Sequence, residues 1–220
     1  MILSKESIKH IKPQPGLVIP DEKIFSLPEK VLQFGTGVLP DYFIDKANRQ
    51  GIFNGRIVVV KSTGNGSSDA FDEQDALYTL CVRGIKNDVK QEETIINSSI
   101  SRVIAAQENW VDVMHCAHNP NLQIIISNTT EVGITLTEDD IHLTPPHSYP
   151  GKLLAFLHAR YQAFNGSAES GMVIIPTELI PDNASRLRTI LIELTAKNPL
   201  DEKFIHWLRE SNHFCNSLVD

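Results

Sequence analysis

Apolar residues along the chain fall into two kinds of segment: short uninterrupted runs, and longer stretches with apolar positions three to four residues apart. The short runs predict strands covered on both faces, as in a parallel sheet, because a strand with a wet side would alternate apolar and polar residues. The run at 56–60 is the clearest, since every residue after Arg56 is apolar and β-branched. Core strands are expected at residues 30–34, 56–60, 123–127 and 171–179.

The longer stretches predict helices, and proline and glycine mark some of their ends. The first helix is expected at residues 41–50, with Pro40 suited to its first turn and Gly51 just beyond its last residue. Two further strands, at residues 76–83 and 93–100, flank the turn-like sequence GIKNDVKQ and predict an antiparallel hairpin. The remaining helices are expected at residues 108–117, 151–164, 184–196 and 202–210.

The order of these elements predicts the fold class. Strands that alternate with helices of ten or more residues imply right-handed crossover connections and an α/β fold. We expect a doubly wound, mostly parallel sheet, with the hairpin as an antiparallel insertion. Residues 1–29 are interpreted as a polar, proline-containing lead-in, residues 30–210 as the α/β domain, and residues 211–220 as a connecting segment.

Composition and charge narrow the range of partners. Of the 220 residues, 41% are hydrophobic and 21% charged, as in an ordinary soluble protein. The net charge of −7 and the scattered Lys and Arg argue against a nucleic-acid partner. The chain has no apolar run of about 18 residues and no apolar leader, so we expect a cytoplasmic protein without a membrane partner. The three cysteines are far apart, which predicts no disulfide framework and no metal site: Cys81, Cys116 and Cys215.

The sequence FGTGV, residues 34–38, places two glycines between the first predicted strand and the first predicted helix. A G-x-G at this place lets the backbone approach a pyrophosphate at the positive end of a helix, and a Cβ on the second glycine would occupy the space of that approach. Two positions depart from the dinucleotide-binding pattern: Pro40 replaces the third glycine, and Lys61 replaces the acidic residue after the second strand. A tight strand-to-helix turn is the alternative interpretation.

Polar residues also follow two later strands. SNTTE, residues 127–131, offers hydroxyls, an amide and a carboxylate where ligands bind in open α/β sheets, although a simple Asx or Ser/Thr turn is the alternative. In PTELIPDN, residues 176–183, we expect the polar side chains to cap the helix that begins near Ser185 instead of facing a crevice. These side chains belong to Glu178, Asp182 and Asn183.

Common hydrolase and NTPase motifs are absent from the sequence. It contains no HExxH, no GxSxG and no GxxxxGK[ST], so zinc hydrolysis, serine hydrolysis and NTPase chemistry lack their usual residues. His147, in PPHSYPGKLL, is a lone histidine and by itself weak evidence of catalysis. Redox chemistry is the class that remains.

Seven motifs occur in the order typical of the mannitol dehydrogenase family: VLQFGTGVL, RIVVVKST, ALYTLCVRG, SNTTEVGI, PPHSYPGKLLAFLHAR, GMVIIPTELIPDN and FCNSLVD. The chain resembles these long-chain polyol dehydrogenases over residues 31–220, and PPHSYPGKL and NSLVD are far more specific than a glycine pair. The resemblance implies a Rossmann-like NAD-binding domain followed by a mostly helical domain with a catalytic lysine. No segment matches the lysine-bearing motif, so catalytic residues stay unassigned, and residues 211–220 are expected to begin the connection to that second domain.

The resemblance further implies an NAD(H)-dependent oxidoreductase that interconverts a keto-sugar acid and its alcohol. A family member acting on another sugar acid or a sugar phosphate, or a non-catalytic nucleotide-binding fragment, is the alternative. Lys61 would tolerate a 2′-phosphate, yet NAD is the first choice of cofactor. Asn183 and Asp220 are implied on the substrate side. The implied cofactor-binding residues are Phe34, Gly35, Thr36, Gly37, Val38, Lys61, Asn128, Thr129, Thr130 and Glu131.

Overall fold

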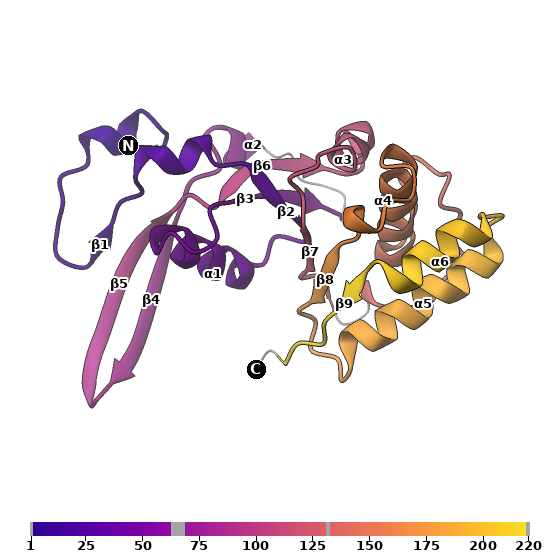
Figure 1. The fold of residues 1–220 in the computed structure, drawn as a ribbon. Helices are drawn as coiled ribbons and strands as arrows, with labels where there is room; N and C mark the ends of the chain where they lie inside the picture. Colours follow the sequence, from indigo (N-terminus) through magenta and orange to yellow (C-terminus); the bar gives the residue numbers. More distant parts are fainter. Residues whose placement is uncertain (1, 63–68, 131–132, 219–220) are drawn as a thin grey trace. The chain divides into compact units, whose positions relative to one another are not determined.

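The computed structural model describes residues 2–62, 69–130 and 133–218. The chain forms two compact units. The first unit comprises residues 1–29, 38–58 and 66–103, and the second comprises residues 30–37, 59–65 and 104–220. Figure 1 labels the helices and strands of both units.

The second unit is built on a parallel sheet. The six-stranded order is β6-β3-β2-β7-β8-β9, and the second unit holds the carboxyl-terminal ends of β3 and β6 together with nearly all of the other strands. β2 pairs parallel with β7, β7 with β8, and β8 with β9, in a register that aligns Phe34, Ser127 and Pro176. The strand bounds are β2 Glu29–Phe34, β3 Arg56–Lys61, β6 Ile100–Ala105, β7 Ile124–Ser127, β8 Val173–Pro176 and β9 His213–Phe214.

Burial along these strands explains why their sequences do not alternate. The last four residues of β2 and the first five of β3 are buried without interruption, so side chains on both faces of the sheet are covered. The predicted α/β class and the mostly parallel, doubly wound sheet are therefore confirmed.

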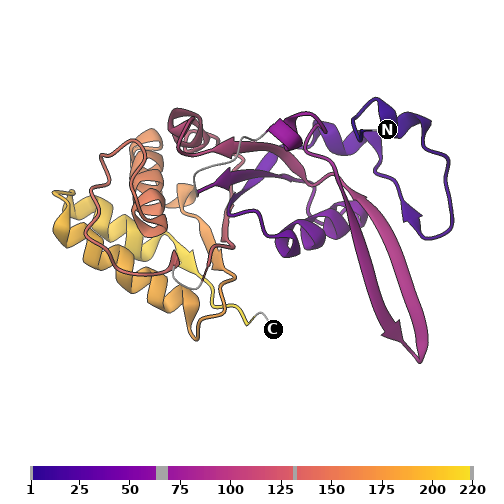
Figure 2. The same cartoon turned by 180° about the vertical axis from the view of Figure 1, so that it is seen from behind.

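Helices of the second unit pack on this sheet and on one another. α4 contacts α3, α5 and α6, and α5 contacts β8 and β9 (Figure 2). Aromatic rings hold α4 to α6, because Tyr161 lies edge-on to both Phe204 and Trp207. The helix bounds are α3 Trp110–Cys116, α4 Tyr149–Ala163, α5 Asn183–Lys197 and α6 Glu202–Glu210, with a 3₁₀ turn at Ala168–Ser170.

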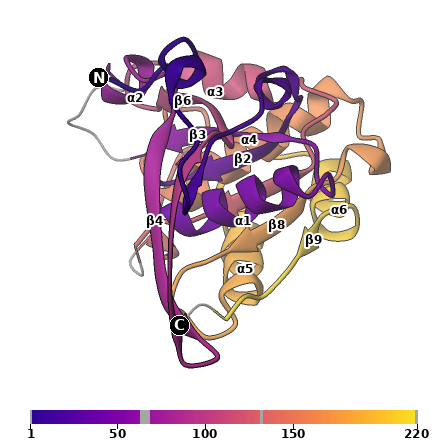
Figure 3. The ribbon, with the colours of Figure 1, turned by 90° about the vertical axis from the view of Figure 1, so that its left-hand side faces the viewer.

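The first unit contains the predicted hairpin, formed by β4 (Tyr78–Lys86) and β5 (Val89–Asn97). Figure 1 shows the tip of this hairpin projecting away from the other elements of the unit. β5 also pairs in parallel with the two residues of β1 (Leu17–Val18), and α1 (Val38–Arg49) packs against β5 (Figure 3). The unit also contains α2 (Asp69–Asp72) and 3₁₀ turns at Ser7–His10 and Glu22–Ser26.

Several boundaries differ from those predicted. The hairpin closes over only Asn87 and Asp88, both with positive φ, because such residues form the tight turns that match strand twist. The strand expected at 93–100 ends at Asn97, whose side chain accepts hydrogen bonds from the backbone and hydroxyl of Ser99, and β6 begins afterwards. α1 begins at Val38, three residues earlier than predicted, so Pro40 lies in its first turn as expected.

Candidate functional site

The strand order creates a switch point between β2 and β7. The chain proceeds from β2 to β3 on one side and returns to β7 on the other, so the connections after β2 and β7 diverge. In open α/β sheets, ligands bind in the crevice that forms at the carboxyl ends of such strands. The glycine pair follows β2 directly, and Asn128 follows β7 directly.

A cleft of about 610 Å³ opens at this end of the sheet, within the second unit. It brings together the glycine turn, the end of β3 and the segment after β7, as the sequence predicts. It also includes residues of the loop that leads into α4, which the cofactor assignment did not contain. The lining residues are Gly35, Thr36, Gly37, Lys61, Ser62, Asn128, Thr129, Thr130, Gly133, Thr135, Thr137, His147, Ser148, Tyr149 and Lys152.

Each glycine of the turn is required by a contact with Asn128. Gly35 has φ +102°, and a Cβ at this residue would overlap the backbone carbonyl of Asn128. A Cβ on Gly37 would overlap the side-chain amide of Asn128. The sequence predicts that the space beside the second glycine serves the approach of a ligand. In the structure Asn128 occupies this space, so the absent side chain serves close packing between the two strand ends.

A buried amide supports the glycine turn from below. Gln33 is completely buried on β2, and its Nε2 donates hydrogen bonds to the carbonyl oxygens of Gly35 and Gly37, both at 3.1 Å. The backbone N–H of Gly35 donates to the carbonyl of Val60 on β3, at 3.0 Å. The turn is therefore held by β2 and β3 as well as by Asn128. Gln33 was not among the predicted residues, although a polar residue inside the apolar run VLQF is the signal that would have found it.

The ends of β7 and β8 are joined by hydrogen-bonded side chains. The carboxylate of Glu178, 4% exposed, accepts hydrogen bonds from the backbone and hydroxyl of Thr129 and from the hydroxyl of Ser127, at 2.7–3.0 Å. The Asn128 amide donates to the hydroxyl of Thr177, which in turn donates to the carbonyl of Ser127. These contacts hold the residues after β7 in the conformation that lines the cleft.

The capping role expected for three residues after β8 is wrong for Glu178 and Asp182. Glu178 is held by Ser127 and Thr129, as described above. Asp182 stands at the N-cap of α5 but makes no capping hydrogen bond. Asn183 is the first residue of α5, one before the predicted residue 184, and its completely buried side chain donates to the carbonyl oxygens of Pro176 and Glu178.

The amino terminus of α4 forms the far wall of the cleft. Ser148 is its N-cap, and the buried carboxylate of Asp139 accepts hydrogen bonds from the backbone of His147 and from the backbone and hydroxyl of Ser148. Burial raises the pKa of Asp139, but these hydrogen bonds outweigh burial and hold the pKa below its ordinary value. Burial lowers the pKa of the Lys152 ammonium, which donates to the His147 carbonyl at 2.8 Å, and the Asp139 charge offsets only part of this effect.

Other predicted site residues lie outside the cleft lining or outside the described residues. Phe34 is completely buried, and its ring packs on that of Tyr149 at 5.2 Å, so it supports the cleft wall. Val38 follows the glycine turn as the first residue of α1. Glu131 and Asp220 lie outside the described residues.

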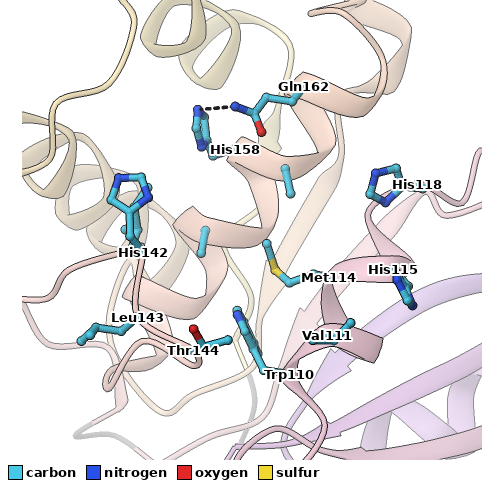
Figure 4. A pocket seen from close by; sticks show the side chains of 13 residues that line it. Trp110, Val111, Met114, His115, His118, His142, Leu143, Thr144, His158 and Gln162 are labelled. Carbon is cyan, nitrogen blue, oxygen red and sulfur yellow. Dashed lines mark hydrogen bonds between the residues drawn. The ribbon is translucent and has the colours of Figure 1, made fainter.

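Two further cavities belong to the second unit. One of about 510 Å³ lies beside the start of α5 and includes Leu179 and Leu218. The other, of about 470 Å³, lies between α3 and α4, with Trp110 and Met114 on α3 and His158 and Gln162 on α4 (Figure 4). Burial and the nearby His142 lower the pKa of His158. Despite the four histidines along this cavity, the described residues contain no group of three or more side chains placed to hold a metal ion.

None of the helices in the described part of the chain is both long and apolar enough to cross a membrane.

Two bacterial proteins are similar in sequence to this chain over most of its length. An altronate oxidoreductase of Bacillus subtilis (strain 168) is 42% identical over 198 residues, which are 88% of this chain and 41% of the relative. An altronate oxidoreductase of Halalkalibacterium halodurans is 38% identical over 204 residues, 90% of this chain and 40% of the relative. The chain thus spans less than half the length of these relatives.

Solved structures share the fold. The Pseudomonas fluorescens mannitol 2-dehydrogenase, in a ternary complex with NAD and D-mannitol, superposes with a TM-score of 0.79 at 19% identity, covering 97% of this chain and 46% of that chain. A D-sorbitol dehydrogenase in substrate-free form superposes with a TM-score of 0.77 at 17% identity, with the same coverage. The family model described as the mannitol dehydrogenase Rossmann domain matches residues 29–220. The chain therefore belongs to the mannitol dehydrogenase family, within which it corresponds to the Rossmann domain.

Proposed function

We propose that the cleft between β2 and β7 binds NAD(H). The observation that carries the proposal is the chemistry of the cleft: a glycine turn at the switch point of a Rossmann sheet, with two lysines, and no carboxylate among the described lining residues. Such a lining suits an anionic group such as a pyrophosphate. The solved relative that contains NAD has the same fold, which supports the choice of cofactor.

In this proposal the glycine turn, Gly35 to Gly37, holds the pyrophosphate. Lys61, at the end of β3, would contact the adenine ribose, and Asn128, Thr130 and Glu131 would contact the nicotinamide ribose. We propose that residues 30–210 form the cofactor-binding domain, with residues 211–220 as the connection to a catalytic domain. Asn183 and Asp220 would contribute to the substrate side. NAD(H) supplies the hydride at the nicotinamide ring, and the protein contributes binding and orientation.

We further propose that the whole protein interconverts tagaturonate and altronate, by reduction of the keto group or oxidation of the alcohol. The relatives named altronate oxidoreductase, at 42% and 38% identity, support this substrate pair. A related member acting on fructuronate and mannonate, or on mannitol 1-phosphate, is the second candidate. Its support is that this chain spans only 41% of the first relative, so residues that select the substrate can lie elsewhere.

The test is a turnover assay on the full-length protein. NADH oxidation is followed by the loss of absorbance of the reduced nicotinamide, with tagaturonate, fructuronate and fructose as substrates. We expect tagaturonate to give the highest kcat/KM. A higher kcat/KM with fructuronate would favour the second candidate, and no NADH oxidation with any of the three would reject the proposed activity.

A further inference from the structure

We infer that Gln33 is a positioning residue that sets the anion-binding conformation of the glycine turn. The inference rests on the proposed binding of NAD(H) and adds a residue and a physical cause. Gln33 is completely buried on β2 and does not line the cleft. Its side-chain amide nitrogen nevertheless donates to the carbonyl oxygens of both Gly35 and Gly37.

Planar peptide geometry links these carbonyl groups to the face that a ligand would meet. In a trans peptide the C=O and the following N–H point in opposite directions. Because the carbonyls of Gly35 and Gly37 point down to Gln33, the next two N–H groups, those of Thr36 and Val38, point away from it. Thr36 is exposed and lines the cleft, so its N–H is presented on the cleft side. Two N–H donors turned the same way are the arrangement that binds phosphate oxygens.

The cost of this arrangement supports a functional reason for Gln33. Its Oε1 atom is buried and has no hydrogen-bond partner among the described residues. A buried acceptor without a partner is destabilising, because it has given up its hydrogen bonds to water without replacing them. The residues on either side, Leu32 and Phe34, are apolar and equally buried, so an apolar residue would fit the same strand without this cost. What an apolar residue cannot do is hold the two carbonyls of the turn.

Asn212 provides a matched control within the same unit. It is also buried, at 5% exposed, and its Nδ2 also donates to two backbone carbonyls, those of Trp207 and Leu208. It lies at the end of α6 and does not line the cleft. Replacing Asn212 therefore removes a comparable pair of donated hydrogen bonds outside the cleft lining. It also removes the hydrogen bond that the Asn212 Oδ1 accepts from the Met172 N–H, so its effect on stability should be at least as large.

The experiment compares Gln33→Met with Asn212→Leu in this chain. Both changes remove the donors with little change of volume, and Gln33→Met also removes the unpartnered acceptor. Affinities for ADP-ribose, which carries the pyrophosphate, and for adenosine, which does not, are measured by titration. We expect Gln33→Met to lower the affinity for ADP-ribose by about tenfold or more and to change the affinity for adenosine by no more than about twofold. Asn212→Leu should lower the melting temperature without changing either affinity.

A second measurement uses the parent chain, so the inference does not depend on the folding of a variant. In amide NMR spectra, ADP-ribose should shift the N–H signals of Thr36 and Val38, and adenosine should leave them in place. The inference would be overturned if folded Gln33→Met bound ADP-ribose with unchanged affinity, or if its affinities for ADP-ribose and adenosine fell equally. It would also be overturned if ADP-ribose shifted neither of these amide signals. If the parent chain bound neither ADP-ribose nor NADH, the proposed cofactor binding itself would be rejected.

Discussion

Gly35 and Gly37 are both constrained by Asn128, yet by different parts of it. At Gly35 the positive φ and the nearby Asn128 carbonyl exclude a side chain, and neither backbone can move without disturbing its strand. At Gly37 the neighbour is the Asn128 side chain, which can rotate if its hydrogen bond to Thr177 is broken. Substitutions at the two glycines should therefore have separable effects.

We expect Gly35→Ala to reduce the free energy of unfolding far more than Gly37→Ala does. The positive φ alone costs about 1–2 kcal/mol at a non-glycine residue, and the overlap with Asn128 adds to it. Gly37→Ala should cost about 1 kcal/mol, the value of one hydrogen bond, and should weaken NADH binding. Urea denaturation, with and without NADH, measures both effects.

Gly51→Ala is the control for backbone strain, because Gly51 has φ +70° and a Cβ there would meet no atom within 4 Å. If Gly35→Ala reduced the free energy of unfolding no more than Gly51→Ala does, the overlap between a Cβ at residue 35 and the Asn128 carbonyl would be contradicted. The double variant Gly37→Ala with Asn128→Ala should recover part of the lost stability. Strictly additive losses would show that the two residues are not in contact.

Lys61 predicts weak discrimination between NADH and NADPH. An acidic side chain at the end of the second strand normally holds the ribose 2′-hydroxyl and repels a 2′-phosphate, whereas here the cleft has Lys61 followed by Ser62. We expect Lys61→Asp to raise the preference for NADH, measured as the ratio of the two dissociation constants. Lys203→Asp, the same charge change on α6, should leave the ratio unchanged. A ratio unaffected by Lys61→Asp would mean that the side chain does not face the ribose.

At the scale of elements, hydrogen bonds to one residue, Asp139, hold the loop between β7 and α4 against the start of α4. Asp139 accepts hydrogen bonds from two successive residues before α4, and a Cβ on Gly151 would overlap its carboxylate. This negative charge lies at the positive end of the helix, where it is stabilising. The anchored loop carries Gly133, Thr135 and Thr137 into the cleft lining.

We expect Asp139→Asn to lower the free energy of unfolding at pH 7 by about 1–3 kcal/mol, because the amide cannot accept all of these hydrogen bonds. The pKa of Asp139 is lower in the folded protein than the ordinary 3.8. Its contribution is therefore complete above that value and is lost as the pH falls through the lower, folded pKa. The difference between parent and variant should shrink below about pH 4. Asp140→Asn, at the exposed neighbouring residue, is the control. A parent–variant difference in the free energy of unfolding that stays constant down to about pH 3, roughly one unit below the ordinary pKa, would contradict the role of Asp139.

At the scale of the whole molecule, the chain corresponds to the Rossmann domain of its family and spans less than half the length of its relatives. It covers 41% of the first relative and 46% of the mannitol 2-dehydrogenase chain. Binding and turnover should therefore separate in this chain.

We expect calorimetric titration of the 220-residue chain to show NADH binding, with a dissociation constant on the order of tens of micromolar. The same sample should not oxidise NADH when tagaturonate is added. The full-length protein, assayed in parallel, is the control for substrate quality. Turnover by the 220 residues alone would contradict the assignment of catalysis to another segment.

The sequence by itself determined the central strands β2, β3, β7 and β8, because burial on both faces of a sheet leaves uninterrupted apolar runs, as at residues 57–60. It did not reveal β1, β6, β9 or α2. It also determined where the cleft forms, since the glycine pair and SNTTE directly follow their strands. Only the tertiary structure decided what each residue there contacts. Glu178 binds Thr129 across 49 positions of sequence, and Asn128 fills the space beside Gly37. Periodicity and turn propensity report only local preferences, whereas these contacts depend on which strands are neighbours in the sheet.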